Sequence, residues 1–187
     1  MFENTVKQKS SELLEKLGVS NDISLASLME ISEINDFHKN FITYKYDYTS
    51  KIFSVDEIKN IIENSEALYL NFLLRPRAAM KFFIYQNNEF SRLDLIQKIL
   101  NLFSIYDFHT KQIPEKIKEK YGSDEKISLN FNDFDKVILS VENDFFENLD
   151  SHGFTDILKP LEEYFGKDSI PPSALSIFFD DRSMHTL

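Results

Sequence analysis

The strongest constraint on the fold of this chain is a pair of apolar runs separated by a proline. The runs cover residues 67–74 and 78–85, and the join between them reads Arg75-Pro76-Arg77. Proline lacks the backbone N–H that a helix interior needs, and it disfavours helical geometry at the preceding residue. The sequence therefore predicts that one helix ends before Pro76 and that a second helix begins there.

The same stretch is about as long as a membrane span. However, Arg75, Arg77 and Lys81 would lie near the middle of such a span. Each charge at the bilayer centre costs roughly 2.5–3.5 kcal/mol. We therefore expect no membrane span, and instead a core rich in Phe and Leu and centred on Leu68–Phe83.

Glycine is scarce, with 4 glycines and 5 prolines in 187 residues. Sandwiches and barrels need many turns with positive φ, which glycine supplies most readily. We therefore expect a mostly α fold, an irregular multi-helix bundle of about seven to nine helices. The length indicates a single helical domain over residues 1–187. A sub-boundary is expected around 111–123, and residues 167–187 are expected to form a C-terminal docking segment and tail.

Local signals place several helix boundaries. Ser54 and Glu57 form a capping box that opens a helix running toward the apolar stretch. Another helix is predicted from about Ser91 to Phe108, followed by a separate short helix over Pro114–Tyr121. No repeat of fixed period is evident, although helical hairpins recur along the chain.

Two short segments alternate in the manner of strands. Tyr44, Tyr46 and Tyr48 alternate with polar residues, and apolar residues alternate over 127–131. A two-stranded β ribbon joining 43–48 to 127–131 is the alternative to a helix that continues past Tyr44. The three tyrosines are also candidate interface residues, because exposed aromatic clusters are typical of protein interfaces.

The composition excludes several classes of function. The formal net charge is −10, which disfavours binding to nucleic-acid phosphates and to anionic membranes. The chain has no cysteine, so it forms no disulfide and no thiolate metal site. The first residues lack the pattern of a signal peptide. We expect a cytoplasmic protein that binds no nucleic acid.

No motif in the sequence indicates catalysis, a metal or a cofactor. The histidines are residues 38, 109, 152 and 185, and none belongs to an HxxxH or HExxH motif. The segment Asn130–Asp135 lacks the glycine and the distal glutamate of a calcium-binding loop. No glycine-rich phosphate loop or nucleophile motif is present. We therefore predict no catalytic residue, no metal ligand and no cofactor.

The two arginines at the helix break, Arg75 and Arg77, are the strongest candidate binding residues. A guanidinium cannot shed its charge, so one near a core needs a carboxylate or a bound anion. The sequence leaves two alternatives open. Either the arginines pair with acids of neighbouring helices, such as Glu63, Glu66 or Asp94, or they form a site for a phosphate or carboxylate at the start of the second helix.

These observations support one function class more than another. The first hypothesis is a non-enzymatic protein-interaction or regulatory helical module that binds a protein partner or self-associates. The alternative is a small enzyme or ligand-binding protein with its anion site at Arg75 and Arg77.

Overall fold

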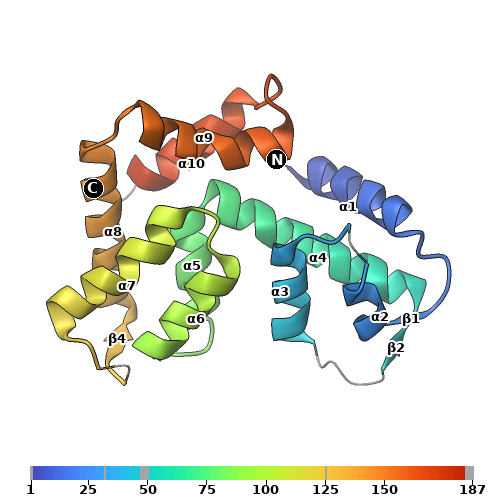
Figure 1. The fold of residues 1–187 in the computed structure, drawn as a ribbon, viewed down its shortest axis with the longest axis horizontal. Helices are drawn as coiled ribbons and strands as arrows, with labels where there is room; N and C mark the ends of the chain where they lie inside the picture. The colour runs from blue at the N-terminus through green and yellow to red at the C-terminus, as the bar shows by residue number, and fades with distance from the viewer. Residues whose placement is uncertain (1, 32, 47–50, 125, 184–187) are drawn as a thin grey trace. The chain divides into compact units, whose positions relative to one another are not determined.

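The computed structural model describes residues 2–31, 33–46, 51–124 and 126–183 (Figure 1). These residues form ten helices and four short strands, so the prediction of a mostly helical fold with short ribbons is confirmed. The chain divides into two compact units, Met1–Leu70 and Asn71–Leu187. The single domain over residues 1–187 stays a prediction, and the sub-boundary expected around 111–123 falls inside the second unit.

The first unit consists of two helix–strand–helix hairpins. Its elements are α1 (Glu3–Leu17), β1 (Ile23–Ser24), α2 (Leu25–Met29), α3 (Asp36–Lys45), β2 (Ile52–Phe53) and α4 (Val55–Leu74), which ends in the second unit. Strand β1 pairs antiparallel with β2, so that Ile23 lies opposite Phe53. The predicted capping box opens α4: the Glu57 N–H donates to Ser54 Oγ, and the Ser54 N–H donates to Glu57 Oε2.

The second unit contains two further hairpins and two additional helices. Its elements are α5 (Pro76–Tyr85), β3 (Phe90–Arg92), α6 (Leu93–Phe103), α7 (Asp107–Tyr121), β4 (Ser128–Asn130), α8 (Phe131–Glu147), α9 (Ser151–Phe165) and α10 (Pro172–Ser183). Strands β3 and β4 pair antiparallel with Ser91 opposite Leu129. In Figure 1, α9 and α10 lie at the end of this unit opposite to β4.

The predicted helix break at Pro76 is confirmed. Helix α4 ends at Leu74, and Pro76 is the first residue of α5. Arg75 between them has φ −133° and ψ 58°, outside the helical region. Proline is well placed here because the first N–H of a helix has no partner within that helix.

The predicted boundaries around Phe108 and Pro114 are wrong. Helix α6 ends at Phe103, and α7 runs from Asp107 to Tyr121 with Pro114 inside it. A proline in a helix interior removes one ladder hydrogen bond. The helix continues because Ile113 and Ile117 on either side of Pro114 are fully buried.

One strand of the predicted ribbon is confirmed, but its expected partner is wrong. Residues 128–130 form β4, which pairs with β3 at residues 90–92 and not with residues 43–48. Residues 43–45 lie in helix α3, and residues 47–50 lie outside the part of the chain that the structure describes. Pairing follows the units: each ribbon joins the two hairpins of one unit.

The two units repeat one arrangement, which the sequence analysis missed. The order helix, strand, helix, helix, strand, helix occurs as α1–α4 and again as α5–α8. The repeat has no fixed period because equivalent elements differ in length: α3 has 10 residues and α7 has 15. Helices α9 and α10 follow the second copy.

Each unit has its own apolar core. The largest fully buried side chains of the first unit are Leu25, Leu28, Ile42, Ile58 and Ile62. Those of the second unit are Phe72, Leu73, Met80, Leu93, Ile96, Phe103 and Phe134. The apolar stretch around Pro76 therefore supplies the core of the second unit, where the ring of Phe72 lies 6.0 Å from that of Phe103 and 6.2 Å from that of Phe83.

Candidate functional site

Each unit buries a histidine against a glutamate. In the first unit, His38 of α3 donates through Nε2 to Glu66 Oε1 of α4 at 3.0 Å. The other ring nitrogen, Nδ1, hydrogen-bonds to the hydroxyl of Ser65. His38 is 2% exposed and Ser65 is fully buried. Two sequence neighbours on α4 therefore hold both nitrogens of the ring.

The second unit contains the equivalent pair. His109 of α7 donates through Nε2 to Glu142 Oε1 of α8 at 2.9 Å. His109 is 1% exposed and Glu142 is 4% exposed. A carboxylate only accepts hydrogen bonds, so Nε2 is the protonated nitrogen in both pairs. The bond fixes the orientation of each ring.

The two pairs occupy equivalent positions in the sequence. The tripeptide Asp-Phe-His opens both α3 and α7. Glu66 lies thirteen residues after Phe53, and Glu142 lies thirteen residues after Leu129. Phe53 and Leu129 are the ribbon residues that lie opposite Ile23 and Ser91, in β1 and β3. The units therefore correspond residue by residue between ribbon and glutamate.

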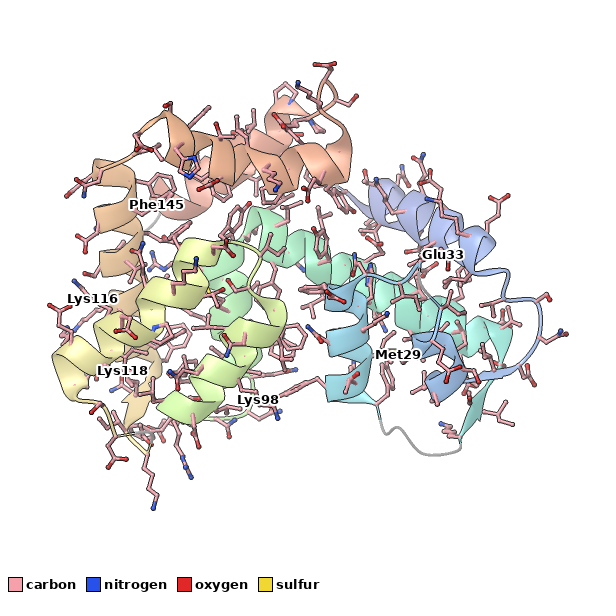
Figure 2. All side chains as sticks on the ribbon, viewed as in Figure 1. Met29, Glu33, Lys98, Lys116, Lys118 and Phe145 are labelled. Carbon is pink, nitrogen blue, oxygen red and sulfur yellow. The ribbon has the colours of Figure 1, made fainter. Side chains whose placement is uncertain are left out.

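An aromatic pair accompanies each histidine. In the first unit, the rings of Phe37 and Tyr69 meet edge to face with centroids 5.0 Å apart. In the second unit, Phe108 stacks on Phe145 with centroids 4.0 Å apart and an interplanar angle of 9°. Figure 2 labels Phe145 on α8. Tyr69 and Phe145 each lie sixteen residues after the ribbon residue of their unit, so the aromatic pairs are equivalent too.

One equivalent position differs between the units. Twelve residues after the ribbon residue, the first unit has Ser65 and the second has Val141. Valine has no hydroxyl, and Nδ1 of His109 is buried without a hydrogen-bond partner among the described residues. A buried polar atom without a partner costs about 1–3 kcal/mol. The difference between Ser65 and Val141 accounts for this orphaned nitrogen.

The Ser65–His38–Glu66 cluster has the residue types of a nucleophile, a base and an orienting acid. A nucleophile must be reached by its substrate. The side chain of Ser65 is completely buried, so the cluster is closed to substrate in this structure. The geometry supports a structural role, in which the cluster ties α3 to α4.

The loop before α8 is unsuited to calcium. A helix–loop–helix hairpin with a twelve-residue loop is the form of an EF-hand, which needs oxygen ligands at positions 1, 3 and 5 and glycine at position 6. In the twelve residues that end at Asp133, Gly122 holds position 1, Lys126 position 5 and Ile127 position 6. Elsewhere among the described residues, no three His, Asp or Glu side chains are grouped to hold a metal ion.

Arg77 is bound to a carboxylate of α8. Its Nε and Nη2 donate to the two carboxylate oxygens of Asp135 at 2.8 and 2.7 Å, and Lys81 Nζ lies 2.7 Å from Asp135 Oδ1. This partner is none of the three acids suggested by the sequence. Burial alone would raise the pKa of Asp135, but the hydrogen bonds from Lys81 and Arg77, together with their charges, lower it below its ordinary value.

Arg75 differs from Arg77 in its surroundings. Arg75 is exposed at the break between the two helices, whereas Arg77 is 3% exposed. An anion at Arg77 would have to compete with the carboxylate of Asp135, which binds Nε and Nη2 bidentately, whereas Nη1 is buried without a hydrogen-bond partner among the described residues. The anion site at these two arginines stays a prediction, with Arg75 as its accessible member.

The three candidate interface tyrosines are not placed alike. Tyr44 on α3 is 42% exposed. Tyr46 follows α3, is half-buried, and has its ring 6.3 Å from the rings of both Phe41 and Phe53. Tyr48 lies outside the described residues. Of the two described tyrosines, Tyr44 has the exposure that an interface residue needs, and the interface itself stays a prediction.

Helices α9 and α10 cover the end of the second unit where α7 begins. Ala174 and Phe178, four residues apart on α10, are 0% and 5% exposed. The ring of Phe178 lies 5.4 Å from that of Tyr106, whose hydroxyl donates to the carbonyl of Leu73 at 2.7 Å. The framework of the second unit therefore binds an apolar face of a helix from its own chain.

The comparisons with known proteins add no family to this description. No family model, no curated protein and no solved structure matches the chain. In the part of the chain that the structure describes, no helix is long and apolar enough to cross a membrane.

Neither buried histidine pair was predicted from the sequence. No metal motif contains a histidine, so none of the four was assigned a role. The signal that could have found them is the recurrence of Asp-Phe-His at residues 36–38 and 107–109, each followed by a capped helix that carries a glutamate. Because the spacing between these features differs between the two units, the repeat is not evident in the sequence.

Proposed function

We propose that the protein is a non-enzymatic protein-interaction module whose second unit accepts an amphipathic helix. Helical hairpins in many proteins take such a helix into an apolar groove, with anchor residues three or four positions apart. The observation that carries the proposal is the docking of α10, in which Ala174 and Phe178 supply that spacing. In this view, α10 occupies the site in cis and a partner helix replaces it.

The contacts of α10 with the rest of the second unit are compatible with its replacement by a partner helix. Its neighbours Leu175 and Ile177 are half-buried, and Phe179 is 36% exposed, so few of its apolar side chains are fully covered. Tethering gives a docked segment an effective concentration of about millimolar, which suppresses competitors until the contact is weakened. Pro171 precedes the helix and Pro172 is its first residue, and the fixed φ of both prolines makes the connection stiff.

A labelled peptide covering residues 167–183 tests the proposal on the full-length chain. The Phe178→Ala chain should bind this peptide at least about tenfold more tightly than the unchanged chain does, since its own α10 competes less well. Phe179→Ala is the matched control and should behave like the unchanged chain. Fluorescence anisotropy measures the affinities, and far-UV circular dichroism confirms that each variant is folded.

A second measurement covers the case in which Phe178→Ala disturbs the fold. In the unchanged chain, amide hydrogens of α10 should exchange with solvent well before those of α8, because a displaceable helix opens locally. If α10 and α8 exchange together, and no variant binds the peptide, α10 is an integral part of the core and the proposal is wrong.

A further inference from the structure

A cavity of about 280 Å³ lies in the second unit between the start of α7 and the middle of α9. A single ordered water needs roughly 10–15 Å³ measured in this way, so the cavity has room for a larger group. Part of its wall is apolar and includes Phe108, Phe145 and Ile157. The stacking of Phe108 on Phe145 makes this part of the wall flat and well ordered.

The rest of the cavity carries an excess of negative charge. Three carboxylates line it, from Asp107, Asp156 and Glu163, against one ammonium, that of Lys159. Asp156 also lies 3.6 Å from His152 Nε2, but both side chains are largely exposed, at 60% and 86%. Exposed ion pairs contribute about 0–1 kcal/mol, so this pairing does not neutralise the site.

The overall charge of the chain acts in the same direction. A net charge of −10 attracts cations over long distances and accelerates their encounter with an acidic cleft. A ligand that suits the cavity needs an apolar stem for the ring wall and a positive group for the carboxylates. Lysine and arginine side chains combine these two properties, because their methylene stems pack on apolar surface while the charge stays in a polar setting.

We propose that this cavity binds a lysine or arginine side chain presented by a protein partner. The stem of that side chain packs beside Phe108 and Phe145, and its charged end lies among Asp107, Asp156 and Glu163. This inference rests on the proposed function, since it supplies a polar anchor beside the site of α10. The expected partner is an amphipathic segment with a basic residue next to its apolar anchors.

Blocked lysine (N-acetyl-lysine methylamide) is the probe, titrated into the full-length chain and followed by amide shifts in two-dimensional NMR. Saturable shifts are expected at Asp107, Phe108 and Ile157. Binding should weaken in high salt, because salt screens the attraction between the carboxylates and the ammonium group. Glu163→Gln should weaken binding about threefold and Lys159→Gln should strengthen it about threefold. Glu162→Gln, on the same helix and outside the cavity lining, is the matched control.

Three results would overturn the inference. They are equal binding of blocked norleucine, equal effects of the Glu163 and Glu162 substitutions, and the absence of saturable shifts. If spermidine binds more tightly than a lysine peptide of equal charge, the cavity is a site for free amines, and the proposal of a protein partner is wrong. The outcome is separable from that of the proposed function, because α10 stays docked in this titration and the peptide assay needs no basic probe.

Discussion

The equivalent positions of Ser65 and Val141 allow the contribution of one buried hydrogen bond to be measured twice in the same protein. Ser65→Ala leaves Nδ1 of His38 buried without its partner. Val141→Ser should give His109 the hydrogen bond that it lacks, because a serine at this position reaches the ring in the first unit. Val141→Ala creates a similar cavity without a hydroxyl and is the matched control.

The expected magnitudes follow from burial. An orphaned polar atom costs about 1–3 kcal/mol, and alanine regains about 0.5 kcal/mol of helix propensity over serine, so Ser65→Ala should lose roughly 0.5–2.5 kcal/mol of unfolding free energy. Val141 is 2% exposed, so both of its replacements lose packing. Giving the orphaned nitrogen of His109 a partner regains the same cost of about 1–3 kcal/mol, less about 0.5 kcal/mol of helix propensity, so Val141→Ser should be more stable than Val141→Ala by roughly 0.5–2.5 kcal/mol.

Urea unfolding followed by far-UV circular dichroism gives the free energies. Amide hydrogen exchange in α3 and α7 shows which unit has lost stability, since exchange reports the local free energy of opening around each amide. Without a partner, a buried serine hydroxyl destabilises a helix interior relative to alanine. The reasoning is refuted if Val141→Ser is the less stable variant of the pair, or if its advantage persists when His109 is replaced by phenylalanine.

Three further predictions concern the second unit. Asp135 has a lowered pKa in the folded protein, so its ion pair stabilises the fold above the unfolded pKa near 4, and this stability is lost as the pH falls through the folded pKa. Asp135→Asn should therefore reduce the loss of unfolding free energy at acid pH. Asp144→Asn, at an exposed position, should not. Burial, with a smaller effect from the charge of Asp133, raises the pKa of Tyr85. The unfolded chain therefore ionises first above about pH 10, and Tyr85→Phe should reduce the alkaline loss of stability in urea titrations. Phe72→Ala should cost about 3–5 kcal/mol in the same titrations, and Phe82→Ala, at an exposed position, less than about 0.5 kcal/mol. Equal costs for these two phenylalanines would show that the core is misplaced.

Local chemistry in the sequence predicted the elements that depend on neighbouring residues. The break at Pro76 and the capping box at Ser54 are as expected because each is decided within a few residues. The helix through Pro114 was missed because burial of Ile113 and Ile117 outweighs the lost ladder bond. Burial is a tertiary effect that local patterns do not report.

The candidate site shows the same division. The sequence marked Arg77 as a residue in need of a counter-charge, but Asp135 lies 58 positions away and no local pattern selects it. Nothing near His38 or His109 in the sequence indicates their partners, since a glutamate 28 or 33 positions further along gives no signal by itself. Their role is evident only in the structure, where α3 packs on α4 and α7 packs on α8.

By itself, the sequence determined that the chain is helical, where its strongest helices begin, and that its net charge is −10. These properties follow from propensity, capping and composition, which need no knowledge of the fold. The tertiary structure decided that two units repeat one arrangement, that each unit encloses a histidine–glutamate pair, and that α10 covers one end of the second unit. Such features depend on residues brought together across long separations, and loops of unequal length conceal that proximity in the linear chain.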